Sequence, residues 1–398
     1  MSCIASVSPV VIVGTGLAGF GIAKELRKLD ADVPIVMVSK DAGDFYSKPM
    51  LSNALGAKKS AASLVMKPSA AMEAELRAQI LKHTQVMGIN LQARCLQLDN
   101  GARQPYSTLV LAMGADPIRL ALEGNGAGQV LSVNDLDDFS LFENALAELD
   151  VRNTTRNVLI LGAGLIGCEF ANDLLARGFS PTVVDLADRV LQRLLPFQAS
   201  LRLQTALEDA GAAFRFKAAV TSVNRSANGF TVRFSDGSTA LSDLVMSAIG
   251  LTPRIALAAQ AGLAVRRGIV TDETLMTSDK GVFALGDCAE VGGSILPYVM
   301  PIMFQSRALA ATLTGKPTAV KYPAMPVTVK TPACPTVVCP PPLQAVGGWE
   351  VLETDDGLET LFLESASSGS ALGFALQGKS VSKRQQFVNR IVSRVPTS

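Results

Sequence analysis

Residues 9–40 read PVVIVGTGLAGFGIAKELRKLDADVPIVMVSK, and they set the architecture of the chain. Val10 to Val13 form an unbroken β-branched run, which is typical of a strand buried on both faces of a parallel sheet. Three glycines follow at G-x-G-x-x-G spacing, and Leu17 to Leu29 then continue with apolar residues at helical spacing. The stretch therefore predicts a strand, a tight turn, a helix and a second strand, the unit that binds one dinucleotide.

Each glycine of this turn has its own place in the predicted unit. Gly14 allows the sharp turn, Gly16 lets the backbone approach a pyrophosphate, and Gly19 lets the helix pack against the strand. The free N–H groups at the start of the helix carry about half a positive charge and point at the phosphates. We therefore expect a nucleotide to bind at the start of this helix.

The same unit occurs a second time at residues 157–188, NVLILGAGLIGCEFANDLLARGFSPTVVDLAD. Gly162, Gly164 and Gly167 repeat the glycine spacing. Asp185 follows roughly 20 residues beyond the glycines, where a carboxylate accepts hydrogen bonds from ribose hydroxyls. Because its negative charge opposes a 2′-phosphate, the second site is predicted to prefer NAD over NADP.

The first unit lacks a matching acid at the end of its second strand. Ser39 and Lys40 stand there, with Asp41 just beyond, so the way in which the first site holds a ribose is left open. Another acid, Asp287, follows a buried strand within GVFALGDCAE, residues 281–290. Ligands bind at the carboxyl ends of parallel strands, so we expect Asp287 to bind a sugar-like polyol; the alternative is an ordinary turn aspartate.

Composition excludes several classes of protein. The chain has 398 residues, too many for one hydrophobic core, and is 48% hydrophobic and 18% charged, as in ordinary globular proteins. Its net charge of +1 argues against wholesale nucleic-acid binding. The six cysteines form no C-x-x-C pair, and the single histidine, His83, cannot build a multi-histidine site. We expect no metal and no redox disulfide.

The N-terminal region bears on localisation. Its first charged residue is Lys24, so it lacks the basic segment of a signal peptide, and glycines break its apolar run. No other segment is long and apolar enough to span a bilayer. We expect a mature cytoplasmic protein without a direct membrane span.

The two units predict an α/β protein with two Rossmann-like dinucleotide-binding domains. From Tyr322 onward, proline clusters and short β-segments predict a small C-terminal α+β domain. We predict a discontinuous first domain of residues 1–112 and 247–320, a second domain of residues 113–246, and a C-terminal domain of residues 321–398.

Two further predictions concern short strands. Lys82 to Val86 is predicted to form a strand, and Phe214 to Val220 is predicted to pair with Phe230 to Phe234 as a hairpin.

Two complete units in one chain imply two nucleotides side by side. If one of them is NADH, the other is most economically FAD, because a hydride needs an acceptor and no evident disulfide or metal provides one. The predicted reaction is hydride transfer from nicotinamide C4 to flavin N5, followed by release of the electrons to an acceptor.

Eight sequence blocks carry a family resemblance. In chain order they are GTGLAG, YSKPMLS, LVLAMGADP, GAGLIGCEFAND, GLTPR, ALGDCAE, LPYVMPIM and MPVTVKTPACP. This order resembles the rubredoxin–NAD(+) reductases, bacterial FAD proteins on the fold shared with glutathione reductase. The resemblance extends from about Val10 to Pro335, and the C-terminal tail matches only weakly.

The resemblance also implies roles for individual residues. The FAD pyrophosphate would lie against Gly14, Thr15, Gly16, Leu17, Ala18 and Gly19. Ser39 and Lys40 would flank the adenosine, Val86 the adenine and Asp287 the ribityl chain, and Lys48, Glu169, Val299 and Lys330 would approach the flavin ring. Pro49, Ala112, Gly286 and Gly250 are further cofactor-binding residues, and NADH would lie against Gly162, Gly164, Leu165, Ile166, Gly167 and Asp185. Lys330, Lys48 and Glu169 are the residues expected to act in catalysis.

The implied activity is NADH-dependent reduction of rubredoxin. A flavin is needed between the two, because NADH gives two electrons together whereas rubredoxin iron accepts one. The resemblance also implies an indirect link, through rubredoxin, to a membrane alkane hydroxylase. Residues 45–53 contain no cysteine, which argues against a peroxide-reducing or water-forming oxidase of the same fold. Two alternatives stay open: a flavorubredoxin or ferredoxin reductase, and a non-catalytic NAD-sensing module.

Docking residues are expected among the cations around the flavin. Rubredoxins are typically acidic, so positive charge should steer their approach. The candidates are Lys48, Arg307, Lys316 and Lys330.

Overall fold

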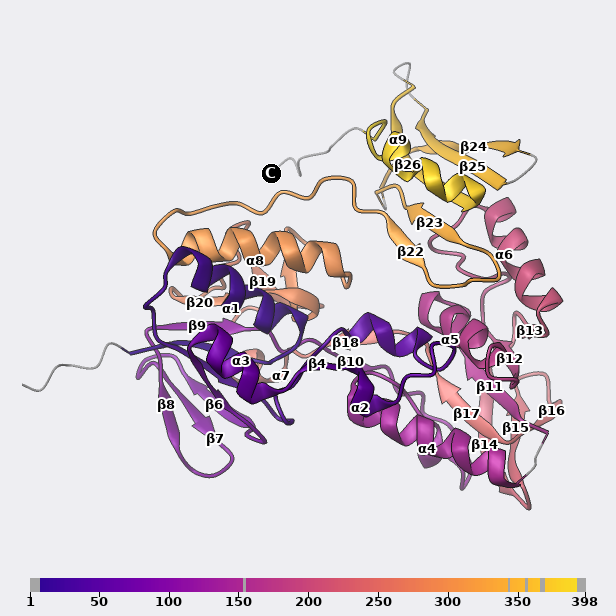
Figure 1. Ribbon diagram of the computed structural model, residues 1–398, viewed down its shortest axis with the longest axis horizontal. Helices are drawn as coiled ribbons and strands as arrows, with labels where there is room; N and C mark the ends of the chain where they lie inside the picture. Colours follow the sequence, from indigo (N-terminus) through magenta and orange to yellow (C-terminus); the bar gives the residue numbers. More distant parts are fainter. Residues whose placement is uncertain (1–7, 153–154, 343, 355–356, 366–368, 392–398) are drawn as a thin grey trace, which may run out of the picture.

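The computed structural model describes residues 8–152, 155–342, 344–354, 357–365 and 369–391 (Figure 1). Figure 1 shows the first parallel sheet with its helices in one lobe and the second parallel sheet in another, with the C-terminal strands beside the second. A long segment after α8 (Val299–Leu313) runs across to the C-terminal strands. The predicted α/β class, with two dinucleotide-binding units and a small C-terminal α+β domain, is confirmed.

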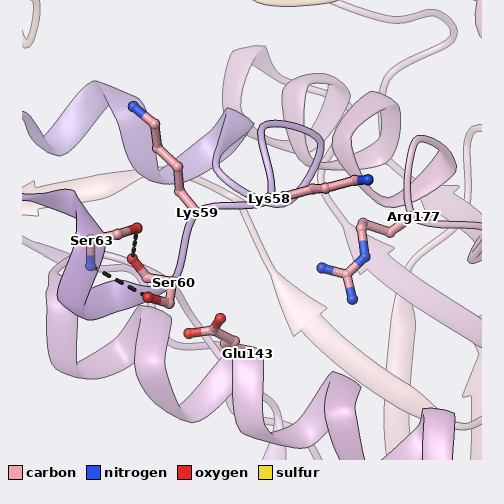
Figure 2. A pocket seen from close by; sticks show the side chains of 6 residues that line it. All are labelled: Lys58, Lys59, Ser60, Ser63, Glu143 and Arg177. Atoms are coloured by element: carbon pink, nitrogen blue, oxygen red, sulfur yellow. Dashed lines mark hydrogen bonds between the residues drawn. The ribbon is translucent and has the colours of Figure 1, made fainter.

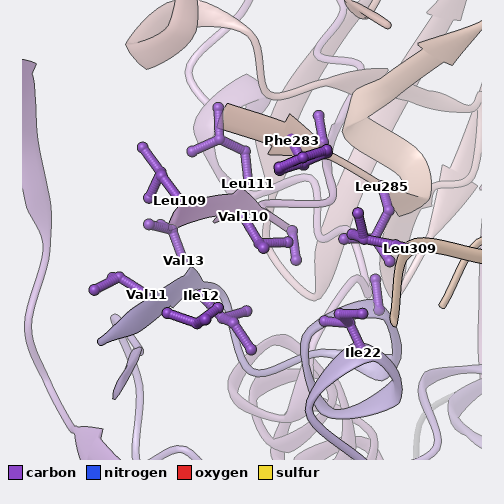
Figure 3. Close-up of a cluster of buried hydrophobic side chains, with 14 of the residues drawn as sticks. Val11, Ile12, Val13, Ile22, Leu109, Val110, Leu111, Phe283, Leu285 and Leu309 are labelled. Atoms are coloured by element: carbon purple, nitrogen blue, oxygen red, sulfur yellow. The ribbon is translucent and has the colours of Figure 1, made fainter. Parts of the chain in front are cut away.

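The first sheet has five parallel strands in the order β20, β9, β1, β2, β5. Ile12, Leu109 and Val110 are completely buried, as expected for strands covered on both faces. Figure 3 shows them in one cluster with Ile22 and Leu309, which come from two helices. The strands are β1 (Val10–Val13), β2 (Ile35–Val38), β5 (Ala78–Leu81), β9 (Thr108–Leu111) and β20 (Val282–Ala284), and the flanking helices are α1 (Leu17–Leu29), α3 (Ser69–Leu76) and α8.

The chain leaves this sheet after β9 and returns to it with β20. Between these strands, β10 (Ala115–Pro117) and β18 (Leu251–Pro253) pair antiparallel, one on the outward and one on the return passage. The segment between them builds the second parallel sheet, in the order β13, β12, β11, β17. Its strands are β11 (Asn157–Leu161), β12 (Ser180–Val184), β13 (Ala213–Arg215) and β17 (Leu244–Ser247), and its helices are α4 (Leu136–Arg152), α5 (Leu165–Leu175) and α6 (Phe197–Asp209).

The C-terminal sheet is antiparallel, in the order β22, β23, β26, β25, β24. Phe374 and Phe387 pack in its core, which explains why the short helix α9 (Arg384–Val388) lies against the sheet. The strands are β22 (Val327–Val329), β23 (Thr336–Cys339), β24 (Gly347–Thr354), β25 (Gly357–Glu364) and β26 (Ala371–Gly378).

Smaller elements complete the described chain. Two three-stranded antiparallel sheets are formed by β6 (Val86–Asn90), β7 (Cys95–Leu98) and β8 (Arg103–Pro105), and by β14 (Val220–Ser226), β15 (Gly229–Phe234) and β16 (Thr239–Ser242). Two-stranded pairs are β3 (Phe45–Tyr46) with β4 (Val65–Lys67), and β19 (Ile269–Thr271) with β21 (Ala289–Val291). The short helices are η1 (Lys48–Asn53), α2 (Ala61–Leu64), η2 (Ala127–Gln129), α7 (Ala256–Gln260), η3 (Gly286–Cys288) and η4 (Lys379–Lys383).

Both predictions of short strands were wrong in their boundaries. Residues 82–85 form the turn between β5 and β6, and His83 within it has a positive φ of 46°. The predicted strand from Phe214 to Val220 divides at Lys217, whose φ is +53°. Its first part is β13, an edge strand of the parallel sheet, and β14, which begins at Val220, is the actual hairpin partner of β15.

Two negative findings apply to the described residues. Within them, no helix has the length and apolarity that crossing a bilayer requires. The same residues contain no group of three metal-ligating side chains of the His, Cys, Asp or Glu type.

Candidate functional site

The first glycine turn connects β1 to α1, and its shape depends on the missing side chains. Gly14 has a φ of +111°, and a Cβ there would lie 2.3 Å from the carbonyl oxygen of Ala112. A Cβ on Gly19 would lie 1.9 Å from the carbonyl oxygen of Gly14. At Gly16 a Cβ would meet no protein atom within 4 Å. The turn therefore packs closely against the sheet and leaves space above Gly16, as binding of a pyrophosphate requires.

The second glycine turn repeats this geometry between β11 and α5. A Cβ on Gly162 would lie 2.7 Å from the carbonyl oxygen of Ala248, and one on Gly167 would lie 1.9 Å from that of Gly162. Gly164 again faces open space. Leu165 and Ile166 begin α5 directly after the turn. The residues of both turns thus fit a dinucleotide in the same way.

Asp185 lies beside the second turn and is held there by backbone groups. Its Oδ2 accepts a hydrogen bond from the Ala163 N–H at 2.5 Å, and its Oδ1 accepts one from the Ala187 N–H at 2.7 Å. Since each carboxylate oxygen has a second acceptor position, the carboxylate remains able to receive ribose hydroxyls. This placement suits the ribose-binding role predicted for Asp185.

The first turn has a hydroxyl pair where the second has an acid. The hydroxyls of Thr15 and Ser39 lie 2.5 Å apart, and Ser39 donates to Asp41 at 2.5 Å. Asp41 also accepts the backbone N–H of Gly43, so its carboxylate is fixed in place and orients the Ser39 hydroxyl. Lys40 is exposed and forms an ion pair with Asp135 at 3.5 Å.

Lys48, Asp287 and Arg254 form a group of opposite charges near the first turn. Burial raises the pKa of the Asp287 carboxyl, and the positive charges of Lys48 and Arg254 act against this rise. Burial lowers the pKa of the Lys48 ammonium, and Asp287 opposes that change. Lys48 Nζ donates to Asn134 Oδ1 at 2.6 Å. Two cations and one carboxylate, each partly buried, therefore form a polar wall of the first site.

Gly286 explains how Asp287 reaches this position. A Cβ on Gly286 would lie 2.8 Å from the Cβ of Ala18, in the first turn of α1. The Gly286 N–H donates to Gln305 Oε1 at 2.8 Å, which fixes the end of β20 against α8. Val299, at the start of α8, is 39% exposed.

Glu169, Lys330 and Ser52 form a second polar group, to which three distant segments contribute. Glu169 lies on α5 and has no exposed surface. Its Oε2 accepts from Lys330 Nζ and from the Ser52 hydroxyl, and its Oε1 accepts from the Lys330 backbone N–H at 3.0 Å. Lys330 Nζ also donates to Ser52 at 2.9 Å. Each of the three side chains is therefore hydrogen-bonded to the other two.

The structure thus divides the three residues expected to act in catalysis. Lys330 and Glu169 contact each other, whereas Lys48 pairs with Asn134. Pro49 and Ser52 lie on η1, which begins at Lys48 and so links the two groups.

The remaining predicted site residues lie at strand ends. Ala112 borders Gly14, and Gly250 precedes β18 with a φ of +116°. Val86 begins β6, two residues after Thr84, whose N–H donates to the Ser39 carbonyl at 2.8 Å. These positions surround the first turn and the passage between the lobes.

Lys316 lies away from Val299, the residue of α8 that is predicted to line the flavin. It follows the C-terminal end of α8, whereas Val299 begins that helix. At 1.5 Å per residue, the two ends of α8 are about 21 Å apart. The helix therefore carries the chain away from Val299 before Lys316 is reached, and a docking role for Lys316 stays a prediction.

Three important residues escaped the sequence reasoning. Ser52 bridges Glu169 and Lys330, Asn134 accepts from Lys48, and Asp173 accepts from the backbone of residues 55 and 56. For Asp173 a signal existed, since it follows Glu169 by one helical turn within GCEFANDL. Nothing in the local sequence marks Asn134.

Comparisons with known proteins add independent findings. Residues 8–310 match the family model described as pyridine nucleotide-disulphide oxidoreductase, and residues 319–391 match the rubredoxin binding C-terminal domain. The chain is 46% identical to the rubredoxin-NAD(+) reductase of Alcanivorax borkumensis over 389 residues, which covers 98% of this chain and 100% of that protein. Its identity to the Acinetobacter baylyi protein of the same name is 43% over 389 residues, covering 96% and 98%.

Other relatives carry different names. The nitric oxide reductase FlRd-NAD(+) reductase of Aeromonas hydrophila is 39% identical over 317 residues, covering 79% of each chain. Among solved structures, the putidaredoxin reductase–putidaredoxin complex matches with a TM-score of 0.86 and 27% identity, covering 96% of this chain and 93% of that one.

Proposed function

Because the chain belongs to the pyridine nucleotide-disulphide oxidoreductase family and is an NADH-dependent oxidoreductase that uses FAD, we propose that rubredoxin is its electron acceptor. One observation carries the proposal: residues 319–391 match a rubredoxin binding domain, and this same segment delivers Lys330 to Glu169 and Ser52. The segment that would receive the partner therefore contributes directly to the polar group beside the nucleotide sites.

FAD, when bound, supplies the chemistry that links the two-electron donor NADH to a one-electron acceptor. The chain's own residues bind and orient the two nucleotides. We assign the first turn, from Gly14 to Gly19, and Asp287 to FAD, and the second turn, from Gly162 to Gly167, and Asp185 to NADH. The negative charge of Asp185 favours NADH, because a 2′-phosphate would be repelled.

Lys330 is assigned to the flavin ring as a source of positive charge. Its ammonium is neutralised in part by Glu169, and Ser52 fixes its direction. A cation held in this way favours the reduced, anionic form of a flavin. Glu169 and Ser52 then act by holding Lys330 in place.

The domain division is part of the proposal. Residues 1–112 and 247–320 would bind FAD, residues 113–246 would bind NADH, and residues 321–398 would receive rubredoxin. The two antiparallel strands β10 and β18 lie where the chain passes between the first two parts, which supports this division.

A stopped-flow experiment tests the function. The purified holoprotein is mixed with NADH and then with oxidised rubredoxin, while the flavin absorbance is followed. Rapid bleaching followed by rapid recovery is the expected result. Bleaching without recovery by rubredoxin would refute the proposed acceptor while leaving the NADH-dependent flavoenzyme intact.

The second candidate acceptor is a flavorubredoxin, which the similarity to the Aeromonas hydrophila protein favours. Parallel assays with rubredoxin and flavorubredoxin at equal concentrations separate the two, since the true partner should show the larger kcat/KM. The relatives named as reductases span nearly the full chain, so a non-catalytic NAD-sensing module is set aside.

The cellular setting completes the proposal. We place the protein in the cytoplasm, where reduced rubredoxin would serve a membrane alkane hydroxylase. Deletion of the gene should then abolish growth on alkanes and leave growth on the corresponding fatty acids unchanged. Equal growth of the deletion strain on both carbon sources would refute this setting.

A further inference from the structure

The second lobe holds the end of the segment Lys48–Gly56 through a single buried carboxylate. Asp173 on α5 is 4% exposed. Its Oδ2 accepts the Leu55 N–H at 2.8 Å, and its Oδ1 accepts the Gly56 N–H at 2.7 Å. Two backbone donors aimed at the two oxygens of one carboxylate bind the ionised group most strongly, since protonation removes the negative charge and leaves one oxygen as a weaker hydroxyl acceptor.

Gly56 makes this contact possible. A Cβ on Gly56 would lie 2.9 Å from Asp173 Oδ1 and 3.2 Å from the Cβ of Ala176. Any side chain at residue 56 would therefore push the segment away from α5. Gly56→Ala therefore disturbs the same contact without changing any charge.

The segment held by Asp173 carries the residues that line the first site. It begins with Lys48, which donates to Asn134, and continues to Ser52, which donates to Glu169. Leu51 and Leu55 are buried in the apolar core of the second lobe. The segment is therefore fastened to α5 at two places, Ser52 and residues 55–56, one helical turn apart on the helix.

The same helix also holds the segment that carries Lys330. Glu169 accepts from Lys330, and Asn172 Oδ1 accepts the Ala333 N–H at 3.1 Å. Helix α5 itself begins at the second glycine turn. One helix thus connects the NADH turn, the segment from Lys48 and the C-terminal domain.

Charged groups on three elements face Asp173. Glu169 lies one turn earlier on α5, Arg177 follows the C-terminal end of α5, and Lys330 comes from the segment after β22. Within residues 48–56 the charged residue is Lys48, whose ammonium is bound to Asn134. Burial raises the pKa of Asp173 to about 6, although the two N–H donors and the two cations act against the rise. The two N–H donors and the two cations therefore stabilise the ionised carboxylate and offset part of the cost of its burial.

We propose that Asp173 is a positioning residue that keeps the segment Lys48–Gly56 fixed beside the flavin, and that loss of its negative charge releases this segment. The inference rests on the proposed function, because it concerns the alignment of Lys48 and Ser52 for the same electron transfer. An amide in place of the carboxylate leaves one of the two N–H groups facing an NH₂ donor, and protonation weakens both hydrogen bonds by removing the charge. Residues 55–56 then lose their hold on α5, and Ser52 is left as the remaining contact with this helix.

Accessible residues next to the contact make release measurable. Lys58 and Lys59 follow Gly56 and line a cavity of about 510 Å³, together with Ser60, Ser63, Glu143 and Arg177 (Figure 2). Lys58 is exposed and Lys59 half-buried. Release of the segment should therefore increase tryptic cleavage after these lysines.

The test compares wild-type holoprotein with Asp173→Asn, Gly56→Ala and a matched control, Asp243→Asn. Asp243 also accepts a backbone N–H, that of Asn157 at 2.8 Å, but it does not contact the segment. Hydrogen–deuterium exchange of the Leu55 and Gly56 amides is measured across pH and corrected for the intrinsic rate. At pH above the wild-type transition, D173N and G56A should lose about tenfold or more of the protection, and D243N should keep it.

Activity provides the second readout. The kcat for reduction of rubredoxin by wild type should fall as pH falls through about 6, whereas D173N should have low kcat, an unchanged KM for NADH and no such transition. Tryptic cleavage after Lys58 should be faster in D173N and G56A than in D243N. If D173N does not fold, the proposal is still tested by two results: the pH dependence of amide exchange at residues 55–56 in wild type, and the loss of protection in G56A.

Two results would overturn the proposal: wild-type protection of residues 55–56 in D173N or G56A, or equal loss of protection in D243N. Failure of wild type to reduce rubredoxin would instead refute the proposed acceptor, and the exchange data would remain interpretable because they require no acceptor.

Discussion

Replacing Asp173 by asparagine should remove a pH dependence of stability that this one carboxyl imposes. Burial disfavours the charge and raises the pKa of Asp173 to about 6 in the folded protein, from its ordinary value of 3.8. The raised pKa means that the folded state binds the proton more tightly. Its stabilising contribution is present below about pH 4 and is lost as pH rises through about 6.

The magnitude follows from the difference of roughly two pKa units. At about 1.4 kcal/mol per unit, wild type should lose on the order of 3 kcal/mol relative to D173N between about pH 4 and about pH 7. Loss of one hydrogen bond in D173N shifts the whole curve by about 1 kcal/mol without changing its slope. The variant should therefore be at least as stable as wild type at neutral pH, even though its segment Lys48–Gly56 is released.

Urea unfolding followed by circular dichroism at matched pH values measures the difference, and other titrating groups cancel between the two proteins. A difference that stays flat across this range, or a wild type that gains stability relative to D173N as pH rises, would refute the reasoning. The expected result would mean that the charge is kept for function at a cost in stability.

Four other outcomes are expected. Lys330→Ala should lower the two-electron flavin potential by tens of millivolts, since about 1.4 kcal/mol corresponds to about 30 mV, and an unchanged spectroelectrochemical midpoint would contradict its role. Asp185→Ala should reduce the preference for NADH over NADPH in kcat/KM by about tenfold or more, because the repulsion of a 2′-phosphate disappears; equal ratios would reassign the ribose site. Gly19→Val should purify with little FAD, since its Cβ would lie 1.9 Å from the Gly14 carbonyl oxygen, and normal flavin content would show that the turn can shift. Lys316→Glu should leave the salt dependence of rubredoxin reduction unchanged, because that lysine lies beyond the far end of α8; a clear change would place the partner there.

Local patterns in the sequence were sufficient for the two dinucleotide units. The strand Val10–Val13 and the helix Leu17–Leu29 have the predicted bounds, and the glycines form the predicted turns. These features are local, because β-branched runs, glycine φ angles and helical spacing all act over a few residues. The motif order was likewise enough to predict the family.

Where the local signal was ambiguous, the prediction was wrong. The short apolar run at Phe214 fits an edge strand of a parallel sheet as well as it fits a hairpin. Only the neighbouring β12 decides between them. The turn at His83 was missed for a similar reason, since a positive φ at a non-glycine residue depends on the surrounding chain.

The polar groups of the site were decided by the tertiary structure alone. Ser52 meets Lys330 across 278 positions of sequence, and Leu55 meets Asp173 across 118. The first contact brings the C-terminal domain to the segment Lys48–Gly56, and the second brings this segment to α5. No periodicity within one segment of the sequence predicts either contact. The glycine motifs, the acid at Asp185 and the order of the blocks were thus enough to predict which nucleotides the chain binds and which family it belongs to. Only the fold decided how Lys48 and Lys330 are held, because buried charges take the partners that long-range packing brings within hydrogen-bonding distance.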